Sequence, residues 1–454
     1  MEGVQATRTR PRPGDQLELR IDALAHGGAG VARSEGYVVF VRGAVPGDRV
    51  LARVVKAKRS FGEAETVELL EPSPDRIDPV AAHPGAPWQV LPYERQLAEK
   101  ESQVRDALER IGRFEEPPVE AIVPAVEQWR YRNKLEYSFG WDDEDDDLVL
   151  GFHRTGRFDA IDDVTEDILA SERVDELRET VKAWCREQGL STWDRRAQTG
   201  LLRNLVVREG RRTGQLQARM VTSPGTSFDV DALAAVAPAD SFLWTRAAGV
   251  AETTREGDTE IVKGDAALAE EVAGLRFRIS PDAFFQTNTE MAERLYSSAA
   301  ELAGLSGREK VLDLFCGIGT IALVLALDAG EVFGVEIVEE AVADAIENAR
   351  LNGIDNAHFF AGDVRLAMRP LLEKSGSADV VVVDPPRAGL SQKVVRRVLE
   401  AEAKKIVYVS CNPTTLAPNA RQMVDAGYEL KTVRPVDMFP QTPHIECVAL
   451  LERA

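Results

Sequence analysis

Short apolar runs alternate with helical stretches through the last third of the chain. Lys310–Thr320 gives a strand-like apolar run, a glycine turn and the start of a helix, and Glu331–Val335, Ala357–Phe360 and Lys405–Val409 repeat the apolar run. Continuous runs of this length are typical of strands that are buried on both faces of a parallel sheet. The pattern therefore predicts an α/β domain over residues 281–454, built on a doubly wound, Rossmann-like sheet.

Residues 14–71 instead alternate apolar and polar positions, in short runs separated by glycine turns. The runs are Leu17 to Ile21, Tyr37–Val41, Arg49–Val55 and Ala64–Leu70, and residues 27–30 are expected to form a flexible glycine loop. This predicts a small, OB-like β-barrel of a kind that often binds single-stranded nucleic acid. The side chains suited to that contact are Lys56, Lys58, Arg59 and Phe61, and an ordinary solvated charge run explains them equally well.

The middle of the chain, residues 72–280, is predicted to be an α+β domain. A helix is expected over residues 93–113, either within this domain or packed on the last one, and another over 173–187. Cations alternate with aromatic residues in Trp129–Lys134, which favours contact with phosphates and unpaired bases; the alternative is an edge strand protected by charge. The acidic turn Asp142–Asp147 is expected to point to solvent.

Composition narrows the class of protein. The 454 residues suffice for two or three domains, and four cysteines, at positions 185, 316, 411 and 447, fit neither a disulfide framework nor a paired metal-ligand pattern. No apolar run reaches membrane-spanning length, so we expect a cytoplasmic protein with no membrane contact. The net charge of −20 argues against a nucleic-acid partner, but residues 1–60 carry 11 Lys+Arg against 6 Asp+Glu. Whole-chain charge is therefore a poor guide, and residues 1–13 are expected to form a flexible basic tail.

The most informative residue is Cys411, which follows the predicted strand Lys405–Val409 directly. Asn412 and Pro413 end that strand, so Cys411 is placed at the carboxyl edge of the sheet, where open α/β sheets bind their ligands. A lone cysteine is most often a small buried hydrophobe. Here Asp384 ends another buried run and Glu446 precedes the strand Cys447–Leu451. Together these residues predict a nucleophile with carboxylates beside it.

A second group of residues predicts a nucleoside-type cofactor. Gly317 and Gly319 follow the first strand of the sheet, and Glu336 closes the second, where a carboxylate can bind two ribose hydroxyls. Asp363 follows the third strand and can read the exocyclic amine of adenine. No third glycine follows at dinucleotide spacing, so a mononucleoside-type cofactor fits better than NAD.

These motifs carry a family resemblance. Asp313-Leu314-Phe315-Cys316-Gly317, Asp384-Pro385-Pro386-Arg387, Ser410-Cys411-Asn412-Pro413 and Phe439 to Glu446 together resemble the RNA uracil-5-methyltransferases, and so do Phe284-Phe285-Gln286 and Tyr131-Arg132-Asn133-Lys134. Residues 14–71 resemble the TRAM barrel that ribosomal members carry in front. The resemblance runs over nearly the whole chain and implies S-adenosylmethionine as cofactor and RNA as partner.

By this resemblance, the S-adenosylmethionine site would be lined by Gln286, Phe315, Thr320, Glu336, Asp363 and Asp384, with Asp384 also near the uracil. Cys411 would add to C6 of the base and make C5 nucleophilic, and Glu446 would remove the C5 proton after methyl transfer. The front barrel favours 23S ribosomal RNA as the substrate of uridine C5 methylation. We also expect the protein to be a monomer. Transfer RNA as substrate, a catalytically vestigial RNA-binding factor and an amino-group methyltransferase are the alternatives.

One departure from the family concerns an iron–sulfur cluster. Members with a cluster carry three cysteines before the Tyr-x-x-Gln-Leu helix and a fourth beyond the Gly-Phe-His segment. The first region here is Ala81–Gln89 and the second includes Glu166, Asp167 and Ile168, with no cysteine in either. A four-iron cluster needs thiolate ligands, so we expect no cluster and no other metal.

Overall fold

The computed structural model describes residues 10–142, 144–154, 156–157, 159–225, 228–250, 254 and 257–453. The expected basic tail at residues 1–13 lies mostly outside them. From residue 10 onward the chain is held on the barrel, where Gly14 N donates to Val54 O at 2.8 Å and Arg12 N donates to the Asp15 carboxylate at 2.7 Å.

The front barrel is a six-stranded sheet in the order β1-β5-β6-β4-β3-β2. Its strands are β1 (Gln16–Arg20), β2 (Ala23–Leu24), β3 (Gly30–Ser34), β4 (Tyr37–Arg42), β5 (Arg49–Ala57) and β6 (Phe61–Glu71). Alternate residues of these strands, such as Val39, Val41, Val50 and Ala52, form its buried core. The four runs seen in the sequence correspond to β1, β4, β5 and β6, whereas the short β2–β3 pair, closed by the glycine loop, had no clear pattern.

A second, seven-stranded sheet forms the middle of the molecule, in the order β13-β12-β11-β10-β7-β8-β9. Its strands are β7 (Lys134–Asp142), β8 (Asp147–His153), β9 (Ile161–Asp163), β10 (Leu202–Glu209), β11 (Leu216–Thr222), β12 (Ser241–Arg246) and β13 (Asp258–Lys263). Two helices accompany it, α2 (Glu172–Glu187) and α3 (Val230–Val236). Strand β7 pairs with β10 over residues 134–138 and with β8 over residues 138–142, and only Lys134 of the segment Trp129–Lys134 lies in β7, so both interpretations of this segment stay open. The acidic turn does join β7 to β8.

The third sheet has the order β18-β17-β16-β19-β20-β22-β21, and β22 alone runs against its neighbours. Its strands are β16 (Lys310–Leu314), β17 (Glu331–Glu336), β18 (Ala357–Ala361), β19 (Val380–Val383), β20 (Lys405–Ser410), β21 (Tyr428–Val436) and β22 (Glu446–Arg453). Chain order reverses between β16 and β19, which is the switch point where such sheets bind ligands. All four residues of β19 are buried, as the unbroken valine run predicts.

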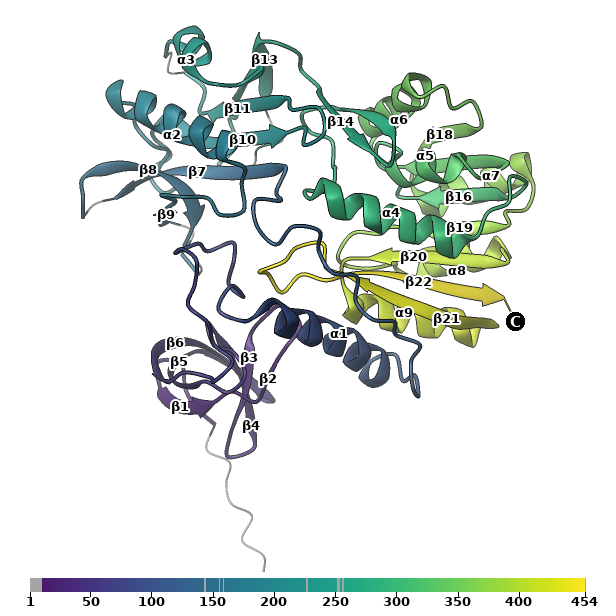
Figure 1. Ribbon diagram of the computed structural model, residues 1–454, viewed down its shortest axis with the longest axis horizontal. Helices are drawn as coiled ribbons and strands as arrows, with labels where there is room; N and C mark the ends of the chain where they lie inside the picture. The colour runs from purple at the N-terminus through teal and green to yellow at the C-terminus, as the bar shows by residue number, and fades with distance from the viewer. Residues whose placement is uncertain are drawn as a thin grey trace, which may run out of the picture.

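Helices cover both faces of this sheet (Figure 1). One face carries α4 (Thr289–Ala303), α5 (Thr320–Ala326) and α6 (Glu339–Leu351); the other carries α7 (Val364–Ser375), α8 (Gln392–Glu400) and α9 (Pro413–Asp425). The hairpin β14 (Leu268–Val272) and β15 (Leu275–Ile279) packs beside α6. The doubly wound α/β fold is thereby confirmed.

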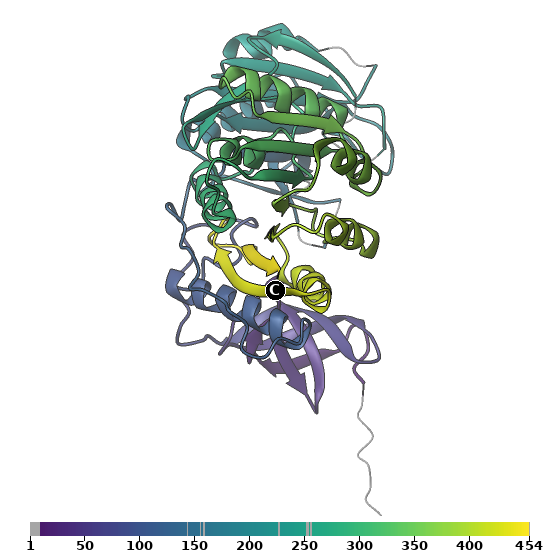
Figure 2. The same cartoon turned by 90° about the vertical axis from the view of Figure 1, so that its right-hand side faces the viewer.

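Helix α1 (Tyr93–Arg110) joins the parts of the molecule. It packs on α9, and both views show it between the barrel and the strands β21 and β22 (Figure 1; Figure 2). Two isolated bridges, from Val119 to Val433 and from Val123 to Val436, extend this contact along β21. The domain limits drawn from the sequence at residues 71 and 280 stay a prediction. No helix within the described ranges is long and apolar enough to cross a membrane.

Candidate active site

Two neighbouring strands bring Cys411 and Glu446 together. Ser410, the last residue of β20, pairs with Cys447 on the antiparallel strand β22. Cys411 follows Ser410 directly after the end of β20, and Glu446 precedes Cys447 as the first residue of β22, so the two lie side by side where the ladder ends. Asn412 caps α9 by accepting from Thr414 N at 3.0 Å, and Pro413 occupies the first helical turn. The sharp change from strand to helix therefore leaves Cys411 at the carboxyl edge of the sheet.

The loop after β19 completes this group. Val383 pairs with Tyr408, so Asp384 leaves the sheet beside the end of β20. The Asn412 side chain donates to Arg387 O at 3.1 Å and fixes the loop that contains Asp384 and Arg387. Cys411, Glu446, Asp384 and Arg387 are candidates for the catalytic residues, and we call them the catalytic group for that reason.

Burial raises the pKa of each acidic member of this group, and repulsion between the members adds to the rise at Glu446 and Cys411. Burial raises the pKa of Asp384 to about 7. Burial, and then the Asp384 charge, raise the pKa of Glu446 well above its usual value, while Arg387 opposes the rise. Burial, followed by Glu446 and Asp384, raises the pKa of Cys411 to about 11. Groups with pKa values displaced in this way are typical of sites that perform acid–base chemistry.

A pocket beside the catalytic group contains four of the six residues expected to bind the cofactor, namely Gln286, Phe315, Thr320 and Asp384. Phe284, Phe285, Cys316, Gly317, Ile318 and Ile321 also line it. The glycine turn bends the backbone sharply, with φ of +69° at Phe315 and +85° at Gly319. It lies at the switch point between β16 and β19, as the sequence predicts.

The other two expected residues lie next to this pocket and do not line it. The Glu336 carboxylate accepts from Gly317 N at 3.1 Å and from Ile337 N at 2.7 Å, so it is tied to the glycine turn. Asp363 caps α7 and pairs with Arg365, which lowers the pKa of Asp363 to about 2. Their roles in binding the cofactor stay predictions.

The pocket also contains two polar residues to which sequence reasoning gave no role in the site, Asp313 and Tyr296. Neither carboxylate oxygen of Asp313 has a hydrogen-bond partner, and burial, followed by the Asp384 charge, raises the pKa of Asp313 to about 8. Tyr296 of α4 is fully buried against Thr320, and burial raises the pKa of its hydroxyl. The position of Asp313 inside an otherwise apolar strand could have identified it as a candidate site residue from the sequence. Nothing in the local pattern distinguishes Tyr296 from a core residue of α4.

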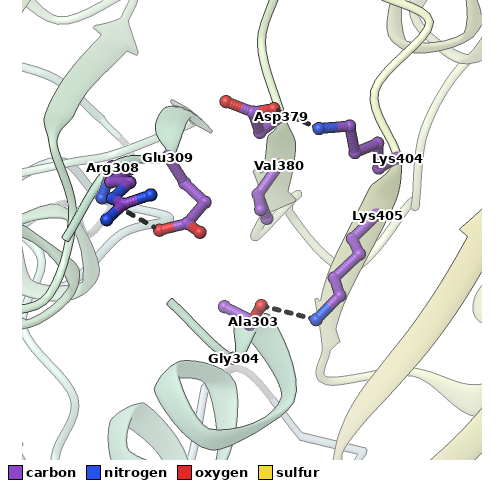
Figure 3. A pocket seen from close by; sticks show the side chains of 8 residues that line it. All are labelled: Ala303, Gly304, Arg308, Glu309, Asp379, Val380, Lys404 and Lys405. Carbon is purple, nitrogen blue, oxygen red and sulfur yellow. Dashed lines mark hydrogen bonds and ion pairs between the residues drawn. The ribbon is translucent and has the colours of Figure 1, made fainter. Parts of the chain in front are cut away.

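A hollow of about 330 Å³ lies at the opposite, amino end of the parallel strands (Figure 3). Both of its lysines are already engaged: Lys404 pairs with Asp379 at 2.9 Å, and Lys405 donates to Ala303 O at 2.9 Å. It contains no residue of the catalytic group. Open α/β sheets bind ligands at the other edge, so we assign no function to it.

The two regions where iron-binding relatives carry cysteines meet in the structure. His83 Nε2 lies 3.0 Å from the Asp167 carboxylate, and the Tyr137 hydroxyl donates to the same carboxylate at 2.8 Å. His83 Nδ1 accepts from Gly85 N at 3.1 Å, so the proton is on Nε2. In the described part of the chain, no group of three or more His, Cys, Asp and Glu residues is placed to hold a metal ion.

Fold and site together define a methyltransferase-type α/β domain with a cysteine at its ligand edge. Residues 256–454 match the family described as tRNA (Uracil-5-)-methyltransferase, and residues 11–67 match the TRAM domain. The chain is 39% identical to an uncharacterized RNA methyltransferase of Halalkalibacterium halodurans, over 96% of this chain and 97% of the relative. It is 40% identical to one of Gloeobacter violaceus, over 97% of each.

A solved structure resembles the whole chain. It is the Pyrococcus abyssi tRNA (uracil-54, C5)-methyltransferase in complex with S-adenosyl-L-homocysteine, with a TM-score of 0.79 and 29% identity over 96% of this chain and 100% of that one. The chain belongs to the RNA (uracil-5-)-methyltransferase family. It is an S-adenosylmethionine-dependent enzyme that acts on RNA, as the motifs predicted.

Proposed function

We propose that the enzyme methylates C5 of a uridine through a covalent bond between Cys411 Sγ and C6 of the base. The observation that carries this proposal is the pairing of Ser410 with Cys447, which puts Cys411 beside Glu446 at the sheet edge. The cofactor pocket reaches the same edge through Asp384. A nucleophile, a base and a methyl donor then surround one position.

S-adenosylmethionine would be held by the residues that line the pocket, and it supplies the methyl group as an electrophile on a sulfonium. The buried and unpartnered Asp313 carboxylate fits a cofactor that carries an ammonium group. Phe315 and the backbone of the glycine turn fit a nucleoside that lies on the switch point. We assign Gln286, Thr320 and Asp384 to the same cofactor, with Glu336 and Asp363 beside them.

The work of the protein residues follows from the chemistry of uracil. C5 of uracil is a weak nucleophile, and addition of the Cys411 thiolate to C6 moves the C5–C6 electron pair toward O4 as an enolate. With its pKa at about 11, Cys411 is a thiol at neutral pH, and its proton passes to the ionised form of Asp384, whose pKa is about 7, which leaves Glu446 to accept a proton later. After methylation at C5, Glu446 takes the C5 proton, the C5–C6 double bond forms again and Cys411 leaves.

For the RNA, we propose 23S ribosomal RNA, with transfer RNA as the second candidate. The TRAM domain at residues 11–67 led to the ribosomal expectation. The similarity to the Pyrococcus abyssi transfer-RNA enzyme favours the second candidate, and it covers 96% of this chain, so it extends into the barrel. The barrel alone therefore does not separate the two substrates, and the monomeric state is likewise part of this proposal.

The experiment is to map 5-methyluridine in ribosomal and transfer RNA from cells with and without the gene. Loss of a single 23S site would support the proposal, and loss of a transfer-RNA site would replace 23S by the second candidate. Recombinant protein with an RNA that contains 5-fluorouridine should form a complex that survives denaturing electrophoresis, because fluorine replaces the proton that must leave. No change in any RNA and no adduct would overturn the proposed function.

A further inference from the structure

The glycine loop of the front barrel touches the segment that leads to Glu446. This barrel loop, residues 25–29, is closed by hydrogen bonds from Ala25 N to Ala29 O at 2.8 Å and from Gly28 N to Ala25 O at 2.9 Å. A Cβ atom on Gly28 would lie 2.8 Å from Cβ of Pro443 and 3.2 Å from Nε1 of Trp88. The contact leaves no space for a side chain at this position. The barrel therefore reaches within three residues of the proposed base.

A small apolar cluster holds the barrel in this place. Leu24 and Val45 of the barrel pack with Trp88 and Leu91, and all four side chains are buried. Trp88 N donates to Gln441 O at 2.9 Å, so the same cluster is anchored to residues 439–446, which we call the base loop. The barrel and the base loop thus form one packed unit. A barrel attached only by a linker would not show such a contact.

Cationic and imidazole side chains gather around this contact. Arg387 belongs to the catalytic group, His444 to the base loop and His26 to the barrel loop, and all three are exposed at the surface. The pKa values of His26 and His444 are both lowered, mainly because neighbouring protein atoms partly bury the two imidazole rings. The charge of Arg387 is the second cause for both. His26 and Arg132 also contribute to the lowered pKa of His444. The three side chains of His26, Arg387 and His444 therefore lie within electrostatic range of one another.

Arg387 and Arg132 lack a carboxylate partner within the described part of the chain, unlike many other arginines of this acidic protein. Many described arginines are neutralised by a carboxylate, such as Arg365 by Asp363 and Arg434 by Glu120. Among the described residues, no carboxylate lies within ion-pair distance of Arg387 or Arg132, and Nε of Arg132 is buried without a partner. Two unneutralised cations next to two neutral imidazoles form a site suited to an anion with several acceptor oxygens.

We propose that the barrel loop is part of the RNA site, where His26, Arg387 and His444 bind one phosphate group of the RNA beside the target uridine. The inference rests on the proposed function. Both imidazoles are neutral at pH 7, so each can donate one ring N–H to the phosphate, and Arg387 supplies the charge. Gly28 allows the loop to approach Pro443 closely enough for His26 to join the site. The barrel would then position the target nucleotide as well as bind RNA elsewhere.

The glycine pair of the barrel loop offers a matched test of the contact. Gly27 and Gly28 have the same φ of +89°, but only Gly28 faces atoms within 4 Å, so Gly27→Ala reproduces the backbone strain without the clash. We expect Gly28→Ala to lower kcat/KM for an unmodified RNA transcript by about tenfold or more beyond Gly27→Ala, with cofactor affinity unchanged. Equal effects of the two substitutions would overturn the proposed contact.

Substitution of the phosphate ligands tests what the site binds. His26→Ala should weaken binding of the same transcript about three- to tenfold, whereas His358→Ala, which removes an exposed histidine from β18 at the far edge of the sheet, should not. Arg387→Gln should reduce the slope of log affinity against log salt concentration by about one. The His26 ring, followed by NMR, should titrate at higher pH once RNA is bound, because a phosphate favours the imidazolium.

The outcomes separate this inference from the proposed function. A wild-type enzyme that forms no 5-methyluridine in any RNA overturns the proposed function. An active wild type together with a His26→Ala variant of unchanged RNA affinity, or a His26 ring whose titration does not move, overturns only the phosphate site.

Discussion

Two buried charged regions of this protein are built in opposite ways. Lys100 of α1 and Asp437 are both fully buried and form an ion pair; Lys100 also donates to Phe439 O at 3.0 Å, and the Tyr93 hydroxyl donates to Asp437 at 2.8 Å. At the sheet edge, Asp313 has no hydrogen-bond partner at either oxygen, and Asp313, Asp384 and Glu446 all have raised pKa values. In the first region the buried charges have their partners within the protein, whereas in the second region they do not.

The difference separates a structural role from a catalytic one. A buried charge is costly unless its partners are present, so the paired region fixes α1 against the base loop and holds it in one position. The unpaired carboxyls cost stability in the free enzyme, which is reasonable only where a substrate or cofactor completes them. Asp437 stands nine residues before Glu446 in the chain. The Lys100–Asp437 pair therefore positions the segment that leads to Glu446, which is one of the unpaired carboxyls.

The largest effect should come from removal of the nucleophile. Cys411→Ala is expected to abolish formation of 5-methyluridine and of the 5-fluorouridine adduct, because the sulfur forms the bond to C6. Cofactor affinity, measured by calorimetry, should stay within about twofold, since Cys411 does not line the cofactor pocket. Cys316→Ala is the matched control on the pocket side and should still form the adduct. Substantial turnover by Cys411→Ala would refute covalent catalysis.

Glu446→Gln should separate addition from elimination. The amide keeps the shape of the side chain and lacks a useful base, so attack and methylation proceed and loss of the C5 proton stalls. Turnover should fall by about 10²–10⁴-fold, and a methylated protein–RNA complex should accumulate in denaturing gels. If Glu446 only supports the fold, the variant will instead misfold or bind RNA weakly, without a trapped complex.

The paired region can be broken from one side. Lys100→Met leaves the Asp437 carboxylate buried without its counter-ion, which should cost about 3–5 kcal/mol of unfolding free energy, measured by urea denaturation. The double variant Lys100→Met, Asp437→Leu removes both charges and should recover much of the loss. A single variant as stable as the wild type would show that the pair does not hold the base loop.

The sequence revealed the catalytic region better than the paired one. Local patterns place Asp384 and Cys411 just after the carboxyl ends of strands, and parallel strands bring these ends to one edge. Glu446 begins β22 and reaches the same edge because this strand is antiparallel to β20, which the local pattern does not show. The pairing of Lys100 with Asp437 joins residues 337 positions apart, and no periodicity of α1 distinguishes this lysine from a solvated one. The same reason hides the approach of Gly28 to Pro443 and of His83 to Asp167. Contacts that depend on the docking of separate elements leave no local signal.

The unpaired region should show itself in the pH dependence of stability. The pKa of Asp313 is about 8 in the folded protein and about 3.9 in an unfolded chain, so the folded state binds the extra proton between these values. Stability contributed by this group is present below about pH 4 and is lost as pH rises toward 8. Asp313→Asn should therefore gain on the order of 1–3 kcal/mol relative to wild type from pH 5 to pH 9, measured by thermal unfolding without cofactor.

Asp363→Asn is the control for this trend. Arg365 lowers the pKa of Asp363 to about 2, so its carboxylate stays ionised from pH 5 to pH 9 and the substitution should give a constant difference. A flat profile for Asp313→Asn as well would mean that the buried carboxyl is ionised throughout, and the contrast between the two regions would fail.

The smallest effect is expected from removal of metal. The His83, Asp167 and Tyr137 side chains form another region that is complete within the protein: His83 Nδ1 accepts from Gly85 N, and the Asp167 carboxylate accepts from His83, Tyr137 and Leu169 N. Burial alone would raise the pKa of Asp167, but the hydrogen bond from His83 and the others lower it. These atoms already have partners, and the two sequence regions that meet here, residues 81–89 and 166–168, contain no cysteine to bind iron. Anaerobically purified protein should be colourless, and chelator treatment should change neither its Tm nor its adduct formation, whereas His83→Ala should lower Tm. Stoichiometric iron in the purified protein would show that a cluster is bound by other residues and that this hydrogen-bonded region does not replace it.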